Sequence, residues 1–241
     1  MKNYLVKSLF EVKDTNWKVL DRSHEKDLFA NYMAMHELSS TSYKKFLQGD
    51  WELKFITGTV TQINEAFEQT FWAIHDLWHS EPCNILYTDP DTIAIKPVDI
   101  WDQFNGFRMF NYTDPREYKG NNPYGREFTN FFNAGVRYFP ATMKEETWQQ
   151  GAAMAKTWDA STYDTEQIIL NAMLWDQGIQ LEETLRPQIA WQLFHPDMSF
   201  MGAWNGCSID QAQILHLHSS RDAGNRLDIM NNIAKQLNFG T

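Results

Sequence analysis

The stretch Cys83–Asp99, CNILYTDPDTIAIKPVD, decides how this sequence is interpreted. Residues 84–87 form a short apolar run that is typical of a buried strand, and a second run, residues 92–96, follows almost at once. Between the two runs, Asp89 and Asp91 flank a proline, which fixes one backbone angle of the turn. Because Mg²⁺ and Mn²⁺ prefer carboxylate oxygens, two carboxylates at the end of a strand favour a divalent metal site. An acidic β-turn without a ligand is the alternative interpretation.

The composition predicts one globular domain that covers residues 1–241. The chain is 43% hydrophobic and contains 10 Trp and 16 Phe, which excludes a disordered chain. No apolar run is long enough to cross a bilayer, the N-terminus lacks a secretory pattern, and the two cysteines lie far apart. We therefore expect a cytoplasmic protein without a membrane anchor. The formal net charge of −10 disfavours a broad nucleic-acid surface but leaves a local DNA contact open. The oligomeric state stays unknown.

Strands and helices alternate in the first half, which predicts an α/β protein with a largely parallel sheet. The predicted strands there are 3–12, 51–56, 84–87 and 92–96, and the helices are 24–47 and 62–78. We expect the first helix to break near Ser39 and Ser40, and the second strand to end at Gly58. The second half is less regular. Its predicted strands are 107–112, 128–139 with an interruption at Asn133–Gly135, 189–194 and 214–218, and its helices are 144–158, 165–175 and 226–237.

Four motifs follow one another in a familiar order. They are ILYTDPDTIAI at residues 85–95, FNAGV at 132–136, TEQIILN at 165–171 and LHLHS at 215–219. The ordered set resembles nucleotide-sugar glycosyltransferases of the GT-A fold, most nearly the family of glycogenin and the bacterial lipooligosaccharide galactosyltransferases. This resemblance implies a single Rossmann-like domain with a central mixed, mostly parallel sheet flanked by helices. It also implies transfer of a sugar from a nucleotide sugar, with UDP as the default base, to an acceptor hydroxyl.

The resemblance assigns the metal ligands. Asp89 and Asp91 match the Asp-x-Asp motif, and the late histidine of the family matches His216 slightly better than His218. Both histidines point to one face of a strand because they are two residues apart. Together with one imidazole, the two carboxylates would hold Mn²⁺ or Mg²⁺ and neutralise the leaving diphosphate. A pair of solvated histidines at the end of a strand is the alternative.

The resemblance also places residues around the donor sugar. Asn133, Ala134 and Gly135 would approach the sugar, and Glu166 would bind its hydroxyl groups. Gln167 would lie on the face opposite the leaving group, and the family implies retention of the anomeric configuration. Glutamine is a poor nucleophile. We therefore expect a front-face path, in which the acceptor enters on the side of the leaving group, as much as a covalent intermediate. For Glu166, a simple role in capping a helix N-terminus remains the alternative.

The chain departs from the family pattern around the diphosphate. Residues 219–222, Ser-Ser-Arg-Asp, stand where the family has Lys-Pro-Trp, and no Lys or Arg occurs between Gly58 and Thr92. Arg221 is the expected partner of the diphosphate, because guanidinium matches phosphate geometry. A GT-A domain that binds a nucleotide sugar without turnover therefore remains a second hypothesis.

A third hypothesis is a zinc hydrolase. His75 and His79 lie one helical turn apart, as in the His-Glu-x-x-His motif, but Asp76 stands at the catalytic position and no third ligand has convincing spacing. The acceptor is open: a glycan, a protein, a small molecule or a hydroxylated nucleobase would be compatible. Aromatic and Asn residues in 101–124 and 196–207 are candidates for an acceptor platform.

Overall fold

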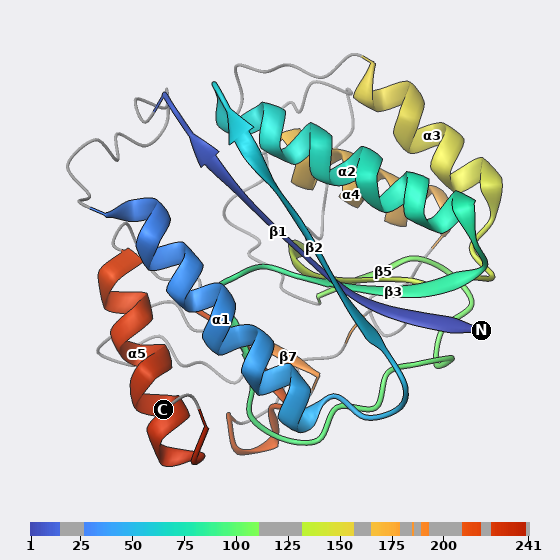
Figure 1. Ribbon diagram of the computed structural model, residues 1–241. Helices are drawn as coiled ribbons and strands as arrows, with labels where there is room; N and C mark the ends of the chain where they lie inside the picture. Colours follow the sequence, from blue (N-terminus) through green and yellow to red (C-terminus); the bar gives the residue numbers. More distant parts are fainter. Residues whose placement is uncertain are drawn as a thin grey trace.

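Two sheets form the centre of the molecule, with helices on both sides (Figure 1). This computed structural model describes residues 1–14, 27–110, 132–156, 165–178, 185, 189–192, 209–217 and 223–239. The larger sheet has the order β2-β1-β3-β6-β5. Its strands are β1 (Lys2–Val12), β2 (Glu52–Val60), β3 (Cys83–Thr88), β5 (Arg108–Phe110) and β6 (Asn133–Phe139). Only β6 runs against the other four, so the sheet is mixed and mostly parallel, as predicted.

The smaller sheet has the order β4-β8-β7 and lies at the carboxyl end of β3. It consists of β4 (Thr92–Ala94), β7 (Ala190–Gln192) and β8 (Ile214–His216). β4 follows β3 after the acidic turn and pairs antiparallel with β8, which comes from the far end of the chain. This pairing brings the two candidate metal motifs of the sequence to the same place.

Burial explains why the middle of β3, residues 85–87, consists of large hydrophobic side chains. Every residue of Cys83–Thr88 is buried, because the strand has neighbours on both edges and helices on both faces. Strand β2, which pairs with β1, continues past Gly58, where the sequence predicted its end. The parallel pairing of β1 with β2 continues to Val12 and Val60, so β2 has hydrogen-bond partners on both sides of Gly58 and does not end there.

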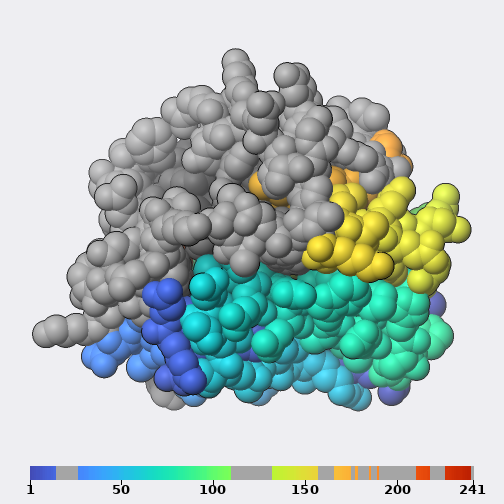
Figure 2. Space-filling model, turned by 90° about the horizontal axis from the view of Figure 1, so that it is seen from above, coloured from blue at the N-terminus to red at the C-terminus, as the bar shows by residue number. Residues whose placement is uncertain are grey.

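The helices divide into two groups, one on each face of the larger sheet (Figure 1). α1 (Leu28–Phe46) and α5 (Ala223–Gln236) lie side by side on one face, joined by Met35, Met230 and Ala234. α2 (Ile63–Ser80), α3 (Glu145–Ala155) and α4 (Thr165–Asp176) cover the other face. Figure 2 looks onto this second group, with α2 and α3 in contact. Within the described residues, no helix is both long and apolar enough to cross a bilayer.

The predicted break in the first helix is wrong. α1 runs without interruption through Ser39 and Ser40. Ser42 donates a hydrogen bond to the backbone oxygen of Ser39 and accepts one from the backbone N–H of Ala94. The small serine side chains thus let the helix approach β4 closely, and the Ser42 hydroxyl satisfies a buried backbone N–H of that strand. These tertiary contacts override the weak helix preference of serine.

The interruption predicted at Asn133–Gly135 is also wrong, because these three residues begin β6 instead of breaking a strand. The remaining elements differ from their predicted limits by a few residues, and part of the regions predicted around 107–112 and 189–194 lies outside the described residues.

Candidate metal and donor site

The acidic turn is fixed to both sheets through its backbone. The N–H of Asp89 donates to the backbone oxygen of Gly135 on β6, at 2.8 Å. The backbone oxygen of Asp91 accepts from the N–H of Leu217, just after β8, at 2.9 Å. The two carboxylates therefore stand at the junction of β3, β6 and β8, where the ends of several strands meet.

Thr92 closes the turn and sets the position of the histidine. Its N–H and its hydroxyl both donate to the backbone oxygen of Asp89, at 3.2 and 2.7 Å. In the antiparallel pairing of β4 with β8, Thr92 lies opposite His216. The register of a short sheet thus places the imidazole next to the carboxylate that precedes Thr92.

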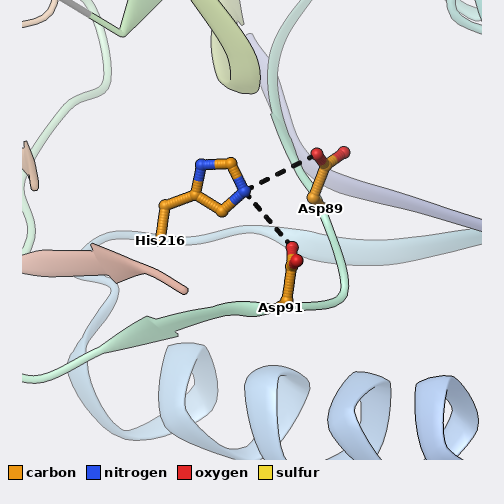
Figure 3. A group of neighbouring side chains, drawn as sticks. All are labelled: Asp89, Asp91 and His216. Carbon is orange, nitrogen blue, oxygen red and sulfur yellow. Dashed lines mark ion pairs between the residues drawn. The ribbon is translucent and has the colours of Figure 1, made fainter. Parts of the chain in front are cut away.

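Asp89, Asp91 and His216 point toward one another (Figure 3). The Nε2 atom of His216 lies 3.3 Å from Oδ1 of Asp91 and 3.9 Å from Oδ2 of Asp89. One ligand atom from each of the three residues lies within 4.8 Å of the others. Adjacent ligands of an octahedral ion with bonds of about 2.1 Å are about 3.0 Å apart, so small side-chain adjustments would suffice to coordinate one. The donor set, two carboxylates and an imidazole, suits Mn²⁺.

Gly135 forms the wall against which the imidazole lies. A Cβ atom at this position would be 2.4 Å from Cε1 of His216 and 2.8 Å from each ring nitrogen. Only a residue without a side chain leaves room for the ring in its present orientation. The glycine of the Asn-Ala-Gly motif thus serves the candidate metal ligand as well as the expected approach to a donor sugar.

The charges of the three residues suit a divalent cation. Burial and the neighbouring Asp91 carboxylate raise the pKa of Asp89, although its side chain is 36% exposed. Burial by itself would lower the pKa of His216, but the two carboxylates more than offset this and raise it. In the absence of an ion, a proton on His216 therefore relieves the repulsion between the two carboxylates. A divalent cation would replace that proton.

Lys7 lies beneath the turn and is fully buried. Its Nζ donates to the hydroxyls of Ser39 and Thr88, at 2.7 and 2.6 Å, and to the backbone oxygen of Asp89, at 3.3 Å. Burial lowers its pKa to about 7, while Asp89 and Asp91 act in the opposite direction. Lys7 is thus a buried amine under the candidate metal site, and it adds a positive charge there when it is protonated.

A second buried cation reaches the turn from the C-terminal helix. Nη1 of Arg226 donates to Oδ2 of Asp91 at 2.6 Å, and Nη2 donates to the hydroxyl of Tyr32 at 2.7 Å. The side chains of Arg226 and Asp91 are only 7% and 8% exposed. One oxygen of Asp91 therefore faces the histidine and the other faces the guanidinium.

A third buried cation, Arg137 on β6, lies on the opposite side of the sheet. It forms an ion pair with Glu166 of α4, and its guanidinium lies 3.9 Å from the ring centre of Tyr87. Burial raises the pKa of Glu166, and Arg137 counteracts this rise. The residue expected to bind donor-sugar hydroxyls is therefore held in place by a buried guanidinium.

Two amides attach α4 to the start of β6. Oε1 of Gln167 accepts from the N–H of Ala134 at 3.0 Å. Asn171 accepts from the N–H of Phe132 at 2.7 Å and donates to its backbone oxygen at 2.9 Å. Asn133 in turn accepts from the N–H of Gly135 through its side chain. The structure thus brings together the two motifs that the resemblance places beside a donor sugar.

Two residues of the expected site, His218 and Arg221, lie outside the described residues. The zinc alternative gains no support in the described part of the chain. The rings of His75 and His79 are 4.3 Å apart, but His75 faces Asp76 and His79 faces Glu145. Among the described residues, Asp89, Asp91 and His216 are the only group of three that converges on a common point.

Comparison with known proteins identifies the fold. No protein-family model matches this sequence, and no curated protein matches it significantly. Among solved structures, the galactosyltransferase LgtC in complex with donor and acceptor sugar analogues matches 99% of this chain and 97% of its own. The TM-score is 0.51 at 12% sequence identity. The chain has a GT-A glycosyltransferase fold.

Two further solved structures share the GT-A fold. An active-site mutant of LgtC matches 99% of this chain and 97% of its own, with a TM-score of 0.50 and 12% identity. The bifunctional glycosyltransferase WbbM matches 98% of this chain with a TM-score of 0.52 and 10% identity, and the match covers 51% of WbbM. At such identities the similarity shows the fold alone.

Sequence reasoning missed the three buried cations. Lys7 and Arg137 stand inside apolar strands, YLVKSLF and NAGVRYF, and a charge in such a run is a signal of a buried partner. Arg226 gave no such signal, because the terminal helix reads as polar and the partner of Arg226 is 135 residues away in the sequence.

Proposed function

We propose that this chain transfers a sugar from a nucleotide sugar, with UDP as the expected base, to an acceptor hydroxyl with the help of a divalent metal ion. The observation that carries the proposal is the convergence of Asp89, Asp91 and His216 at the carboxyl end of β3. The GT-A fold supports it, since LgtC, which spans nearly the same elements, was solved with donor and acceptor sugar analogues.

The charges around the turn suit a diphosphate. Lys7, Arg137 and Arg226 are buried cations, and they offset the carboxylates of Asp89, Asp91 and Glu166 when Lys7 is protonated. A bound Mn²⁺ or Mg²⁺ would then add two positive charges to a group of side chains whose net charge is zero. The diphosphate of a nucleotide sugar carries two negative charges, so the complete site would be balanced.

In the proposed reaction, the metal supplies Lewis-acid stabilisation of the leaving diphosphate. Asp89, Asp91 and His216 would hold the metal ion, and Gly135 leaves room for the histidine ring in its present orientation. The acceptor oxygen bonds to the anomeric carbon as the bond from this carbon to the diphosphate breaks, and the acceptor proton passes to the departing phosphate. Attack on the leaving group's side gives retention.

Glu166 and Gln167 orient the donor sugar in this proposal. Arg137 fixes the Glu166 carboxylate, and the hydrogen bond to Ala134 fixes the Gln167 amide. Both side chains are thus arranged before the donor binds, which lowers the entropy lost on binding. The fixed Gln167 amide suits a front-face path, since no covalent partner is needed there.

A binding domain without turnover is the second candidate. The observation that favours it is that Glu166 is already engaged in a buried ion pair, which limits its contact with a sugar. Both candidates bind Mn²⁺ and UDP, but only the enzyme cleaves the donor. Release of sugar from a panel of nucleotide sugars, with and without acceptors, therefore separates them.

The test of the proposed function uses Asp89→Asn. Asp89 is partly exposed and makes no ion pair with Arg226 among the described contacts, so the substitution should leave the fold intact. Loss of one charged ligand should reduce donor turnover at least about a hundredfold.

Asp76→Asn is the matched control, because Asp76 is exposed on α2, away from the turn. It should retain wild-type turnover. Full activity of the wild type in excess EDTA, or of Asp89→Asn with Mn²⁺, would refute the metal-dependent transfer.

A further inference from the structure

The C-terminal segment of the chain carries both a candidate metal ligand and a cation that opposes the metal. His216 ends β8, and Arg226 follows on α5, which lies beside α1 (Figure 1). Arg226 reaches across to Asp91 of the acidic turn and to Tyr32 of α1. A guanidinium thus binds directly to one of the three carboxylate and imidazole groups that would hold the metal.

The contact between Arg226 and Asp91 is a buried ion pair, not a solvent-exposed one. The Arg226 side chain is 7% exposed, its two hydrogen bonds are 2.6 and 2.7 Å long, and its guanidinium lies 5.2 Å from the ring centre of Tyr32. Because the pair is nearly excluded from water, its charges are screened weakly. The positive charge of Arg226 therefore acts strongly on anything that binds to the other oxygen of Asp91.

Two consequences follow for a divalent ion. Oδ2 of Asp91 is taken by the guanidinium, which leaves Oδ1, the atom nearest His216, as the coordinating oxygen. In addition, only the Asp91 carboxylate would separate the guanidinium from the ion, so the two positive charges would repel each other. When it is protonated, Lys7 adds a second positive charge beneath the turn. The ion alone would give the site an excess of positive charge, and a diphosphate would remove that excess.

We propose that Arg226 is an internal counter-ion that weakens metal binding to the free protein and makes it conditional on the nucleotide diphosphate. This inference rests on the function proposed above. Arg226 acts through Asp91 and is a positioning residue. Metal and nucleotide then raise each other's affinity by the same factor, as thermodynamic linkage requires.

A purely structural role for Arg226 predicts a different outcome. If the guanidinium only held Asp91 in place, its removal would weaken Mn²⁺ binding equally with and without UDP. If it is a counter-ion, its removal strengthens Mn²⁺ binding to the free protein and reduces the effect of UDP. The sign of the change in Mn²⁺ affinity therefore decides between the two roles.

The experiment measures Mn²⁺ binding to the full chain by electron paramagnetic resonance, without and with saturating UDP. The wild type should bind Mn²⁺ at least about tenfold more tightly with UDP. Arg226→Met, which keeps the unbranched stem of the side chain but not the charged guanidinium, should bind Mn²⁺ alone at least about tenfold more tightly than the wild type. The factor by which UDP increases the Mn²⁺ affinity of this variant should fall correspondingly.

Two variants keep the charge and change the contacts. Arg226→Lys and Tyr32→Phe should both retain the weak binding of Mn²⁺ alone and the gain with UDP, even if thermal stability decreases. Unchanged or weaker Mn²⁺ binding by Arg226→Met would overturn the inference. Should that variant fail to fold, equal Mn²⁺ affinity of the wild type with and without UDP would overturn it. Failure of UDP to bind at all would instead refute the proposed function.

Discussion

The substitution Gly135→Ala should disable the metal site with a single methyl group. The new Cβ would lie 2.4 Å from Cε1 of His216, whereas ordinary contacts begin at 3.4 Å, so the ring must retreat by the difference of about 1 Å. His216 is 1% exposed and belongs to β8, whose pairing with β4 limits any movement of the backbone. The ring must therefore rotate away from the carboxylates.

Displacement of a ligand by such a distance removes it from coordination. We expect Mn²⁺ affinity in the presence of UDP to fall at least about a hundredfold, because even changes one step removed from a metal cost ten- to a hundredfold. The overpacked ring should also lower the free energy of unfolding by about 1–3 kcal/mol. Calorimetric titration with Mn²⁺ and urea unfolding measure the two effects.

The control and a rescue follow from the same geometry. Gly58→Ala on β2 places its Cβ 3.2 Å from the ring of Phe10, a tight contact that a ring shift of a few tenths of an ångström would relieve, and should leave Mn²⁺ affinity unchanged. In the double variant Gly135→Ala/His216→Ala, stability should recover but metal affinity should not. Wild-type Mn²⁺ affinity in Gly135→Ala would refute the packing of His216 against Gly135.

Two further predictions address other parts of the molecule. His36 is buried against Phe55, and burial lowers its pKa from 6.5 to about 4. Its contribution to stability is therefore complete above pH 6.5 and is lost as the pH falls toward 4, by about 2 kcal/mol between about pH 7.5 and about pH 5. Urea unfolding of the wild type and of His36→Phe measures this, and equal pH dependence in both would contradict it. Glu166→Gln should lower donor turnover far more than UDP affinity, since UDP lacks the sugar, whereas Gln167→Ala should slow turnover only moderately. An inverted product, detected by NMR coupling constants, would remove both residues from these roles.

The sequence predicted the parts of the fold that depend on local pattern. β3 is a short apolar run and α2 is a long, regular amphipathic pattern, and the limits of both in the structure differ from the predicted ones by one or two residues. The convergence of the three candidate metal ligands was also predictable, because Asp89 and Asp91 directly follow a strand and the resemblance supplied the histidine. His216 lies 125 residues from Asp91, and no local signal alone would have joined them.

The predictions that failed concern features that depend on contacts between segments far apart in the sequence. The serines of α1 have weak helix preference, but Lys7, Thr92 and Ala94 use their hydroxyl groups, and the helix continues. Strand β2 passes through Gly58 because β1 provides hydrogen-bond partners beyond it. Neither effect can be read from the residues themselves, since the partners lie on other elements.

The buried cations also bear on the departure of this sequence from the family pattern. The helix that precedes the acidic turn lacks the expected basic residue, yet Arg137 brings a guanidinium to Glu166 from β6. An unpaired Arg137 at this depth would cost several kcal/mol, so Glu166 stabilises the fold as well as serving the proposed sugar contact. Loss of turnover in Glu166→Gln is therefore ambiguous by itself, because a loosened β6 would also disturb Gly135 and the metal. UDP and Mn²⁺ affinities are the necessary reference: if both persist while turnover falls, the carboxylate acts on the sugar.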